Sequence, residues 1–151
     1  MNKTLILVRH AHALSRYEAS VPTDGERPLC AQGEQKALQT AQDLLGRKIV
    51  PQQIFTSPLL RAVQTAQILS QTLQAPVTPE NILDGFHPDE EVKDFLMGQM
   101  QRHNCLIAVG HNPCITYVTA LLSGQVRPFS PGSFAVLDIQ DTAVKLVYFG
   151  V

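Results

Sequence analysis

The chain has 151 residues and a formal net charge of −1, so its charge does not favour a nucleic-acid or membrane-surface partner. Hydrophobic residues make up 44% of the sequence, which is typical of a soluble globular protein, and no apolar run approaches the ~18 residues of a membrane span. The length predicts a single domain, residues 1–151. Three unclustered cysteines and an N-terminal apolar run too short for a signal peptide predict a cytoplasmic protein with reduced thiols.

The first predicted strand is the apolar run from Leu5 to Val8, which Arg9 and His10 follow directly. A short continuous apolar run of this kind predicts a strand that is buried on both faces. Because ligands bind at the carboxyl ends of parallel strands, we expect Arg9 and His10 at the mouth of a pocket. Arginine there favours an anion, and histidine can be a nucleophile, an acid–base group or a metal ligand.

Residues 13–31 are predicted to form a long loop, because Pro22 and Pro28 interrupt the segment. Long loops in compact domains are often functional, and Arg27 in this one is a candidate for a cationic rim. Residues 32–46 have the apolar spacing of an amphipathic helix.

A second short strand is expected at Ile54 to Thr56, followed by Ser57-Pro58 as the N-cap and first-turn pair of a helix. Arg61 then lies in the first helical turn, where free backbone N–H groups and the helix dipole already favour anions.

The second half of the chain is predicted to repeat this alternation of strand and helix. The expected elements are a loop at 75–88, a helix at 89–102, a buried strand at 106–109, a helix that starts at Asn112-Pro113, and a hairpin of strands at 134–139 and 144–149. His111 follows the buried strand as His10 follows the first one.

Strands that alternate with helices predict a mostly parallel α/β sheet, whose carboxyl edge gathers the polar residues that follow three strands. These are Arg9 with His10, Ser57 with Arg61, and His111. Two arginines can hold the oxygens of a phosphoryl group while one histidine attacks phosphorus and the other donates a hydrogen bond. A nucleophilic histidine must be neutral, which an ordinary pKa near ~6.5 allows at neutral pH.

Other phosphatase chemistries lack their motifs in this sequence. No cysteine has arginine six residues later, and neither Asp-x-Asp nor a P-loop motif occurs. A metal held by His10 and His12 remains an alternative, since residues two apart in a strand share a face, but neither HExxH nor a cysteine pair supports it. We therefore expect no metal and no cofactor.

The motifs together resemble those of the histidine phosphatase superfamily, also called the phosphoglycerate-mutase-like or RHG family. Residues 9–11 (RHA) stand where that family has Arg-His-Gly, residues 57–66 (SPLLRAVQTA) resemble its second signature, and residues 109–113 (VGHNP) its third. Residues 27–33 (RPLCAQG) resemble its short branch, the SixA-type phosphohistidine phosphatases. The matches follow the family's order over nearly the whole chain.

The resemblance implies a three-layer α/β/α sandwich with a mostly parallel sheet and no need for a metal. It implies that His10 is the phosphorylated nucleophile and that Arg9, Arg61 and His111 bind the phosphoryl group. The candidate substrate-binding residues are Arg27, Ser57 and Asp84.

Three departures from the family pattern stand out. Ala11 replaces a glycine beside the nucleophile, and Cys30 replaces a helix-capping threonine, which weakens that cap. Longer members also carry a glutamate proton donor between the second and third motifs. Asp84 is the best candidate for that role here.

The expected function is that of a phosphohistidine phosphatase acting on a phosphorylated histidine-containing protein through a covalent phosphohistidine intermediate. The short segment between the second and third motifs leaves little material for a lid, so an open pocket that suits a protein substrate is expected. Two alternatives stay open. They are a small-molecule phosphomonoesterase of the same superfamily and a non-catalytic module that binds a phosphorylated partner.

Overall fold

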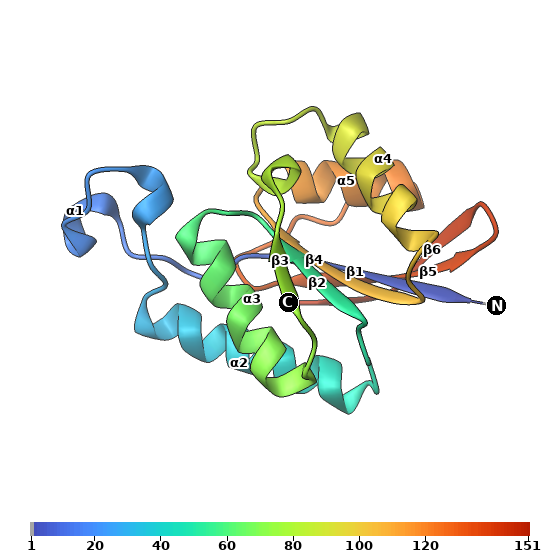
Figure 1. Ribbon diagram of the computed structural model, residues 1–151, viewed down its shortest axis with the longest axis horizontal. Helices are drawn as coiled ribbons and strands as arrows, with labels where there is room; N and C mark the ends of the chain where they lie inside the picture. The colour runs from blue at the N-terminus through green and yellow to red at the C-terminus, as the bar shows by residue number, and fades with distance from the viewer. Residues whose placement is uncertain (1) are drawn as a thin grey trace.

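A six-stranded sheet forms the centre of the computed structural model, which describes residues 2–151 (Figure 1). The elements in chain order are β1 (Lys3–Arg9), α1 (Arg16–Ala19), the 3-10 helix η1 (Asp24–Glu26), α2 (Ala31–Gly46), β2 (Gln53–Thr56), α3 (Leu60–Leu73), β3 (Val77–Pro79), the 3-10 helix η2 (Asn81–Leu83), α4 (Asp89–Met100), β4 (Cys105–Gly110), α5 (Cys114–Ser123), β5 (Phe134–Gln140) and β6 (Ala143–Gly150). Each helix among the described residues is too short or too polar to cross a membrane.

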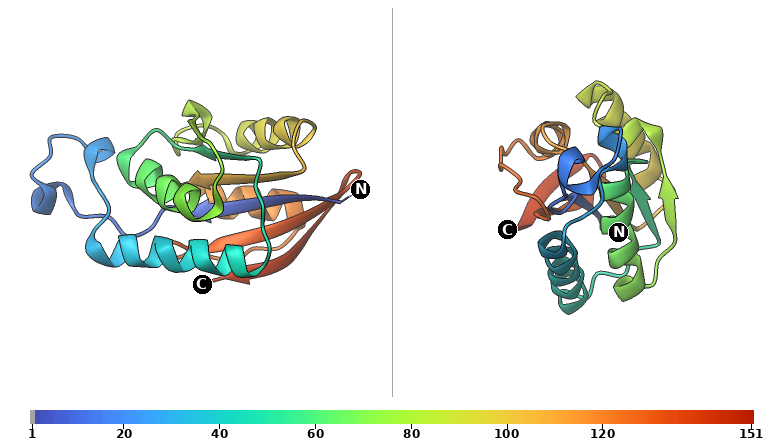
Figure 2. Two further views of the ribbon diagram at one scale, coloured as in Figure 1. Left: turned by 60° about the horizontal axis from the view of Figure 1, so that its bottom comes forward. Right: turned by 90° about the vertical axis from the view of Figure 1, so that its left-hand side faces the viewer.

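The strands lie in the order β3-β2-β4-β1-β5-β6. The first four are mutually parallel, while β5 is antiparallel to β1 and forms a hairpin with β6. Helices α2 and α3 cover one face of the sheet and α4 and α5 cover the other (Figure 2). The expected α/β/α sandwich with a mostly parallel sheet is therefore confirmed.

Strand β1 contributes side chains to two hydrophobic cores, one on each face of the sheet. Leu5 and Leu7 pack with α4 and α5, whereas Ile6 and Val8 pack with α2 and α3, and all four side chains are fully buried. An apolar run without alternation is what burial on both faces requires. The strand that carries Arg9 and His10 is thus anchored from both sides.

Two segments predicted as loops contain regular structure. Within residues 13–31, α1 forms because Ser15 and Glu18 make a reciprocal capping box, and η1 follows it. Within residues 75–88, β3 pairs with β2 as the edge strand of the sheet, a position that tolerates Pro79. The prolines in both segments predicted loops, because proline is depleted from strands and helix interiors. The segment with α1 and η1 extends beyond the carboxyl ends of the strands (Figure 1, Figure 2).

Candidate active site

The ends of three adjacent strands bring the predicted polar residues together. Arg9 ends β1, Ser57 follows β2, and His111 follows β4, which lies between those two strands. A cleft of about 400 Å³ opens at this edge. It is lined by Arg9, His10, Arg27, Leu59, Arg61, Asp84, Gly85, Phe86, His111, Asn112 and Pro113. All the predicted site residues line it except Ser57, which is fully buried behind His111.

The His10 ring is oriented by two hydrogen bonds, one at each ring nitrogen. Its Nδ1 lies 2.7 Å from the main-chain oxygen of Ala11, and since a carbonyl can only accept, Nδ1 carries the proton. Nε2 is therefore the unprotonated ring nitrogen. Its lone pair accepts a 3.4 Å hydrogen bond from Nε of Arg61, so the unprotonated nitrogen is aligned with a cationic donor.

Burial is the main reason that the pKa of His10 is lowered to about 4, although the hydrogen bond to Ala11 acts in the opposite direction. The positive charges of Arg61, Arg9 and Arg27 lower this pKa further. His10 is consequently neutral at pH 7, the state in which Nε2 can act as a nucleophile.

His111 lies beside His10, with ring centroids 5.0 Å apart and planes inclined by 56°. One hydrogen bond of 2.7 Å joins its Nε2 to Oγ of Ser57, and that oxygen also accepts from the backbone N–H of Leu59. Burial, followed by the charges of His10 and Arg61, lowers the pKa of His111 to about 3. The second histidine is thus also neutral, and Ser57 fixes its ring.

Ser57 was predicted to cap helix α3, and that prediction is wrong. The helix begins at Leu60, with Leu59 in the N-cap position and no side-chain cap. The Ser57 hydroxyl binds His111 instead. Arg61 remains in the first turn of α3, as expected.

The predicted helix start at Asn112-Pro113 is similarly displaced. Helix α5 begins at Cys114, and no side chain caps it. The Asn112 amide donates to the main-chain oxygen of Phe129, while its Oδ1 accepts from the hydroxyl of Thr116. Asn112 therefore ties the turn after β4 to the 129 region and to α5.

Asp24 belongs to the site, and sequence reasoning missed it. Its Oδ2 accepts a 3.0 Å hydrogen bond from Nη2 of Arg61, and its main-chain oxygen accepts one of the same length from Nη1. Its Oδ1 pairs with Nη1 of Arg27, and these interactions, led by Arg27, lower the pKa of Asp24. An acidic residue three before Arg27 was the available signal, but Asp24-Gly25 resembled an ordinary turn.

The other two arginines also have main-chain partners. Arg9 Nη1 donates to the carbonyl oxygen of Phe129, and Arg27 Nε donates to that of Leu14, each at 2.8 Å. The Nε of Arg9 is buried and has no hydrogen-bond partner among residues 2–151. Such a donor is costly to leave unpaired.

Asp84 lies in the cleft and shapes its rim. Its Oδ1 accepts hydrogen bonds from the backbone N–H of Phe86 at 2.8 Å and from Nδ1 of His87 at 2.9 Å. Between them Gly85 has φ +91°, and a Cβ there would lie 3.3 Å from Cβ of His111. This loop therefore packs closely against the second histidine.

The two local departures from the family pattern cause little disturbance. Ala11 is fully buried, and its N–H donates to the hydroxyl of Thr65. Cys30 still caps α2, because its Sγ accepts from the N–H of Gly33 at 3.3 Å.

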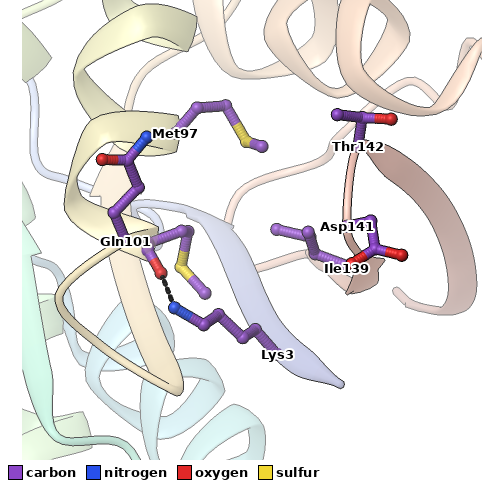
Figure 3. Close-up of a pocket in the computed structure, with 7 residues that line it drawn as sticks. Lys3, Met97, Gln101, Ile139, Asp141 and Thr142 are labelled. Atoms are coloured by element: carbon purple, nitrogen blue, oxygen red, sulfur yellow. Dashed lines mark hydrogen bonds between the residues drawn. The ribbon is translucent and has the colours of Figure 1, made fainter. Parts of the chain in front are cut away.

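A different cleft lies at the opposite end of β1, between the end of α4 and the β5–β6 hairpin (Figure 3). It is lined by Lys3, Met97, Met100, Gln101, Ile139, Asp141 and Thr142. The Lys3 ammonium already donates to the main-chain oxygen of Met100.

Within residues 2–151, no cluster of three or more His, Cys, Asp or Glu residues is arranged to hold a metal ion.

Comparison with known proteins identifies the family. Residues 5–90 match the histidine phosphatase superfamily (branch 1), and this chain belongs to that superfamily. An uncharacterized protein of Picosynechococcus sp. is 34% identical over 127 residues, which are 80% of this chain and 74% of that protein.

Solved structures share the fold at low identity. The protein histidine phosphatase SixA complexed with tungstate matches with a TM-score of 0.87 at 22% identity, over 97% of this chain and 96% of that one. A mycobacterial glucosyl-3-phosphoglycerate phosphatase matches with a TM-score of 0.77 at 15% identity, over 99% of both chains. The resemblance to the superfamily and to the SixA-type fold is thus confirmed.

Proposed function

We propose that this protein is a phosphohistidine phosphatase that transfers the phosphoryl group of a phosphorylated protein to Nε2 of His10. The observation that carries the proposal is the orientation of His10. Its proton is held on Nδ1 by Ala11, and its unprotonated Nε2 accepts a 3.4 Å hydrogen bond from Nε of Arg61. In the first step a bond forms between phosphorus and Nε2 while the bond to the leaving group breaks. In the second, water attacks phosphorus, and His10 is released with inorganic phosphate.

The neighbouring cations suit the charge that moves in both steps. Arg61 presents Nε to the position beside Nε2 that the phosphoryl group must occupy. The unpartnered buried Nε of Arg9 would gain an acceptor from an anion in the cleft. With His111 as a third donor, these groups stabilise charge on the phosphoryl oxygens without a bound metal, and we expect the reaction to need none.

The small amount of chain above the cleft favours a protein substrate. Between α3 and β4 the chain builds β3, η2 and α4, and of this segment only residues 84–86, in the loop before α4, line the cleft. That loop is too short to close over a small ligand, whereas an open cleft admits a phosphorylated side chain presented on a protein surface. Arg27 at the rim would assist binding.

Small-molecule phosphomonoesterase activity is the second candidate, and Asp84 is the observation that favours it. An alkoxide leaving group needs a proton from the enzyme, and Asp84 is the carboxyl group that lines the cleft beside His111. A phosphorylated imidazole that carries a proton on its other ring nitrogen leaves as a neutral group and makes no such demand.

Phosphate release separates these functions. The wild type, His10→Ala and His12→Ala would be assayed with a histidine-phosphorylated protein and with a panel of small phosphoesters. His12 is the matched control because it lies two residues away but lines another cleft. We expect higher kcat/KM for the phosphoprotein, loss of activity only in His10→Ala, and acid-labile label on His10 after rapid quenching with labelled substrate.

Other outcomes identify the alternatives. A higher kcat/KM for a phosphoester would assign the protein as a phosphomonoesterase. Tight binding of the phosphoprotein without phosphate release would make it a binding module. Label on a residue other than His10 would overturn the proposed nucleophile.

A further inference from the structure

Phe86 is an exposed aromatic side chain at the mouth of the active-site cleft. Its exposed fraction is 83%, although it lines the same cleft as His10 and Arg61. The turn that presents it is fixed, since Asp84 Oδ1 accepts from the Phe86 N–H and Gly85 supplies the positive φ. The turn therefore fixes the backbone of Phe86 at the mouth of the cleft.

Two further apolar side chains lie around the same cleft. Leu59 comes from the connection between β2 and α3, and Pro113 from the turn between β4 and α5. With Phe86 they form an apolar rim from three separate segments, above a floor that carries Arg9 and Arg61. A ligand must then have a strongly anionic group at one end and an apolar body next to it.

The polar side chains next to the apolar rim already form hydrogen bonds within the protein. Both ends of the Asn112 amide are hydrogen-bonded, to Phe129 and Thr116. Asp84 Oδ1 accepts two hydrogen bonds. Arg27 donates from Nε to the main-chain oxygen of Leu14 and from Nη1 to Oδ1 of Asp24. Few groups remain to bind the hydroxyls of a sugar phosphate, which would lose their hydration against hydrocarbon.

We propose that Phe86, with the rest of the apolar rim, docks the surface of the partner protein that surrounds its phosphohistidine. This inference rests on the proposed function and adds the surface by which the substrate is recognised. The phosphoryl group fills the cationic floor, the flat imidazole lies against the aromatic ring, and apolar residues beside the phosphohistidine cover Leu59 and Pro113. Aromatic anchors of this type often contribute most of the free energy of an interface.

Three substrates of increasing size test the role of Phe86. Phosphoramidate has no body on the leaving group, phosphoimidazole has the ring alone, and a histidine-phosphorylated protein has the ring and its surroundings. We expect Phe86→Ala to lower kcat/KM roughly tenfold for the phosphoprotein, less for phosphoimidazole, and not for phosphoramidate. Phe86→Tyr, which keeps the ring, should restore most of the loss. Val50→Ala is the control, since Val50 is 75% exposed, does not line the cleft and precedes β2, whose other end carries the site.

The outcomes separate this inference from the proposed function. A wild type that cleaves the phosphoprotein, with Phe86→Ala equally active on it, would overturn only the docking role. Equal losses on all three substrates would place Phe86 in support of the floor and also overturn it. A wild type that hydrolyses phosphoesters and spares the phosphoprotein would overturn the proposed function, and the docking role with it. Activity on phosphoramidate reports that the variant is folded.

Discussion

The guanidinium group of Arg61 is shared between two partners, with Nε 3.4 Å from Nε2 of His10 and the opposite edge bound to Asp24. Because a guanidinium group is planar and rigid, fixing Nη1 and Nη2 also fixes the direction of Nε. Asp24 thus aims Nε of Arg61 at Nε2 of His10. Arg61 itself is 8% exposed, so its charge acts in a poorly solvated place.

Arg9, Arg61 and His111, the groups proposed to bind the phosphoryl oxygens, should be essential for turnover. Alanine at Arg9, Arg61 or His111 removes a preorganised donor, and such losses typically lower kcat by ~10²–10³. Steady-state kinetics with a phosphohistidine substrate would measure the effect, and circular dichroism would show that the fold survives. A near-wild-type kcat in Arg61→Ala would exclude that residue from the site.

Asp24→Asn should lower kcat/KM about tenfold, because the amide keeps the size of the side chain but loses the charge that holds Arg61 and Arg27. Asp43→Asn is the matched control, since it breaks an ion pair with Arg47 that lies away from the cleft. Kinetics and inhibition by inorganic phosphate would be compared. Tighter phosphate binding with unchanged kcat would show instead that Asp24 competes with the substrate.

The two site histidines, buried His111 and half-buried His10, predict a loss of stability in mild acid. The pKa values of His10 and His111 are about 4 and 3, below the ordinary value near 6.5. Between the lowered pKa values and 6.5, the unfolded chain binds protons that the folded chain does not. The free energy of unfolding therefore falls as pH drops from about 6.5 toward 4. Above pH 6.5 the full contribution is present.

Denaturant unfolding at pH 7 and pH 4.5 would measure this effect in the wild type and in His10→Gln. The variant lacks one of the two groups and should lose less stability between the two pH values. NMR titration of the imidazole signals should give a His10 midpoint well below 6.5. A midpoint near 6.5 would contradict the burial argument.

Much of this site could be predicted from residues that follow buried strands. The apolar runs before His10 and His111 fix their strands, and the parallel order of β1, β4 and β2 brings their ends together. The sequence could not predict which side chains form hydrogen bonds with one another. Ser57 is a residue type that often caps helices, but its hydroxyl binds His111 instead. The helix starts later than the Ser-Pro pair suggests.

The same limit applies to Asp24 and Phe86. Asp24 begins the short 3-10 helix η1 and Phe86 lies in the turn after η2, and no local spacing predicts which way either side chain points. Proline-rich stretches hid β3 for a related reason, since an edge strand is defined by pairing with β2 rather than by its own composition.

Gly85→Ala should lower both stability and turnover. A side chain at φ +91° costs about 1–2 kcal/mol, and its Cβ would press on His111 at 3.3 Å. Gly98→Ala is the control, because a Cβ there meets nothing within 4 Å and alanine favours the helix interior of α4. Unfolding free energy and kcat would be measured for both. Unchanged kcat in Gly85→Ala would mean that the loop can move without disturbing His111.

Asp84→Asn should separate the two classes of substrate. Asparagine can keep the hydrogen bond that Oδ1 accepts from Phe86, so the turn and the rim survive the change. It cannot supply a proton to an alkoxide, so ester hydrolysis should fall by ~10²-fold, the lower end of the usual contribution of general acid catalysis. Phosphohistidine hydrolysis should change by no more than a few-fold, because a protonated imidazole leaves neutral. The ratio of the two kcat/KM values is the measurement. An equal and steep loss for both substrates would show that Asp84 serves the phosphoryl group or the fold itself, and no loss for either would show that the ester's proton comes from water.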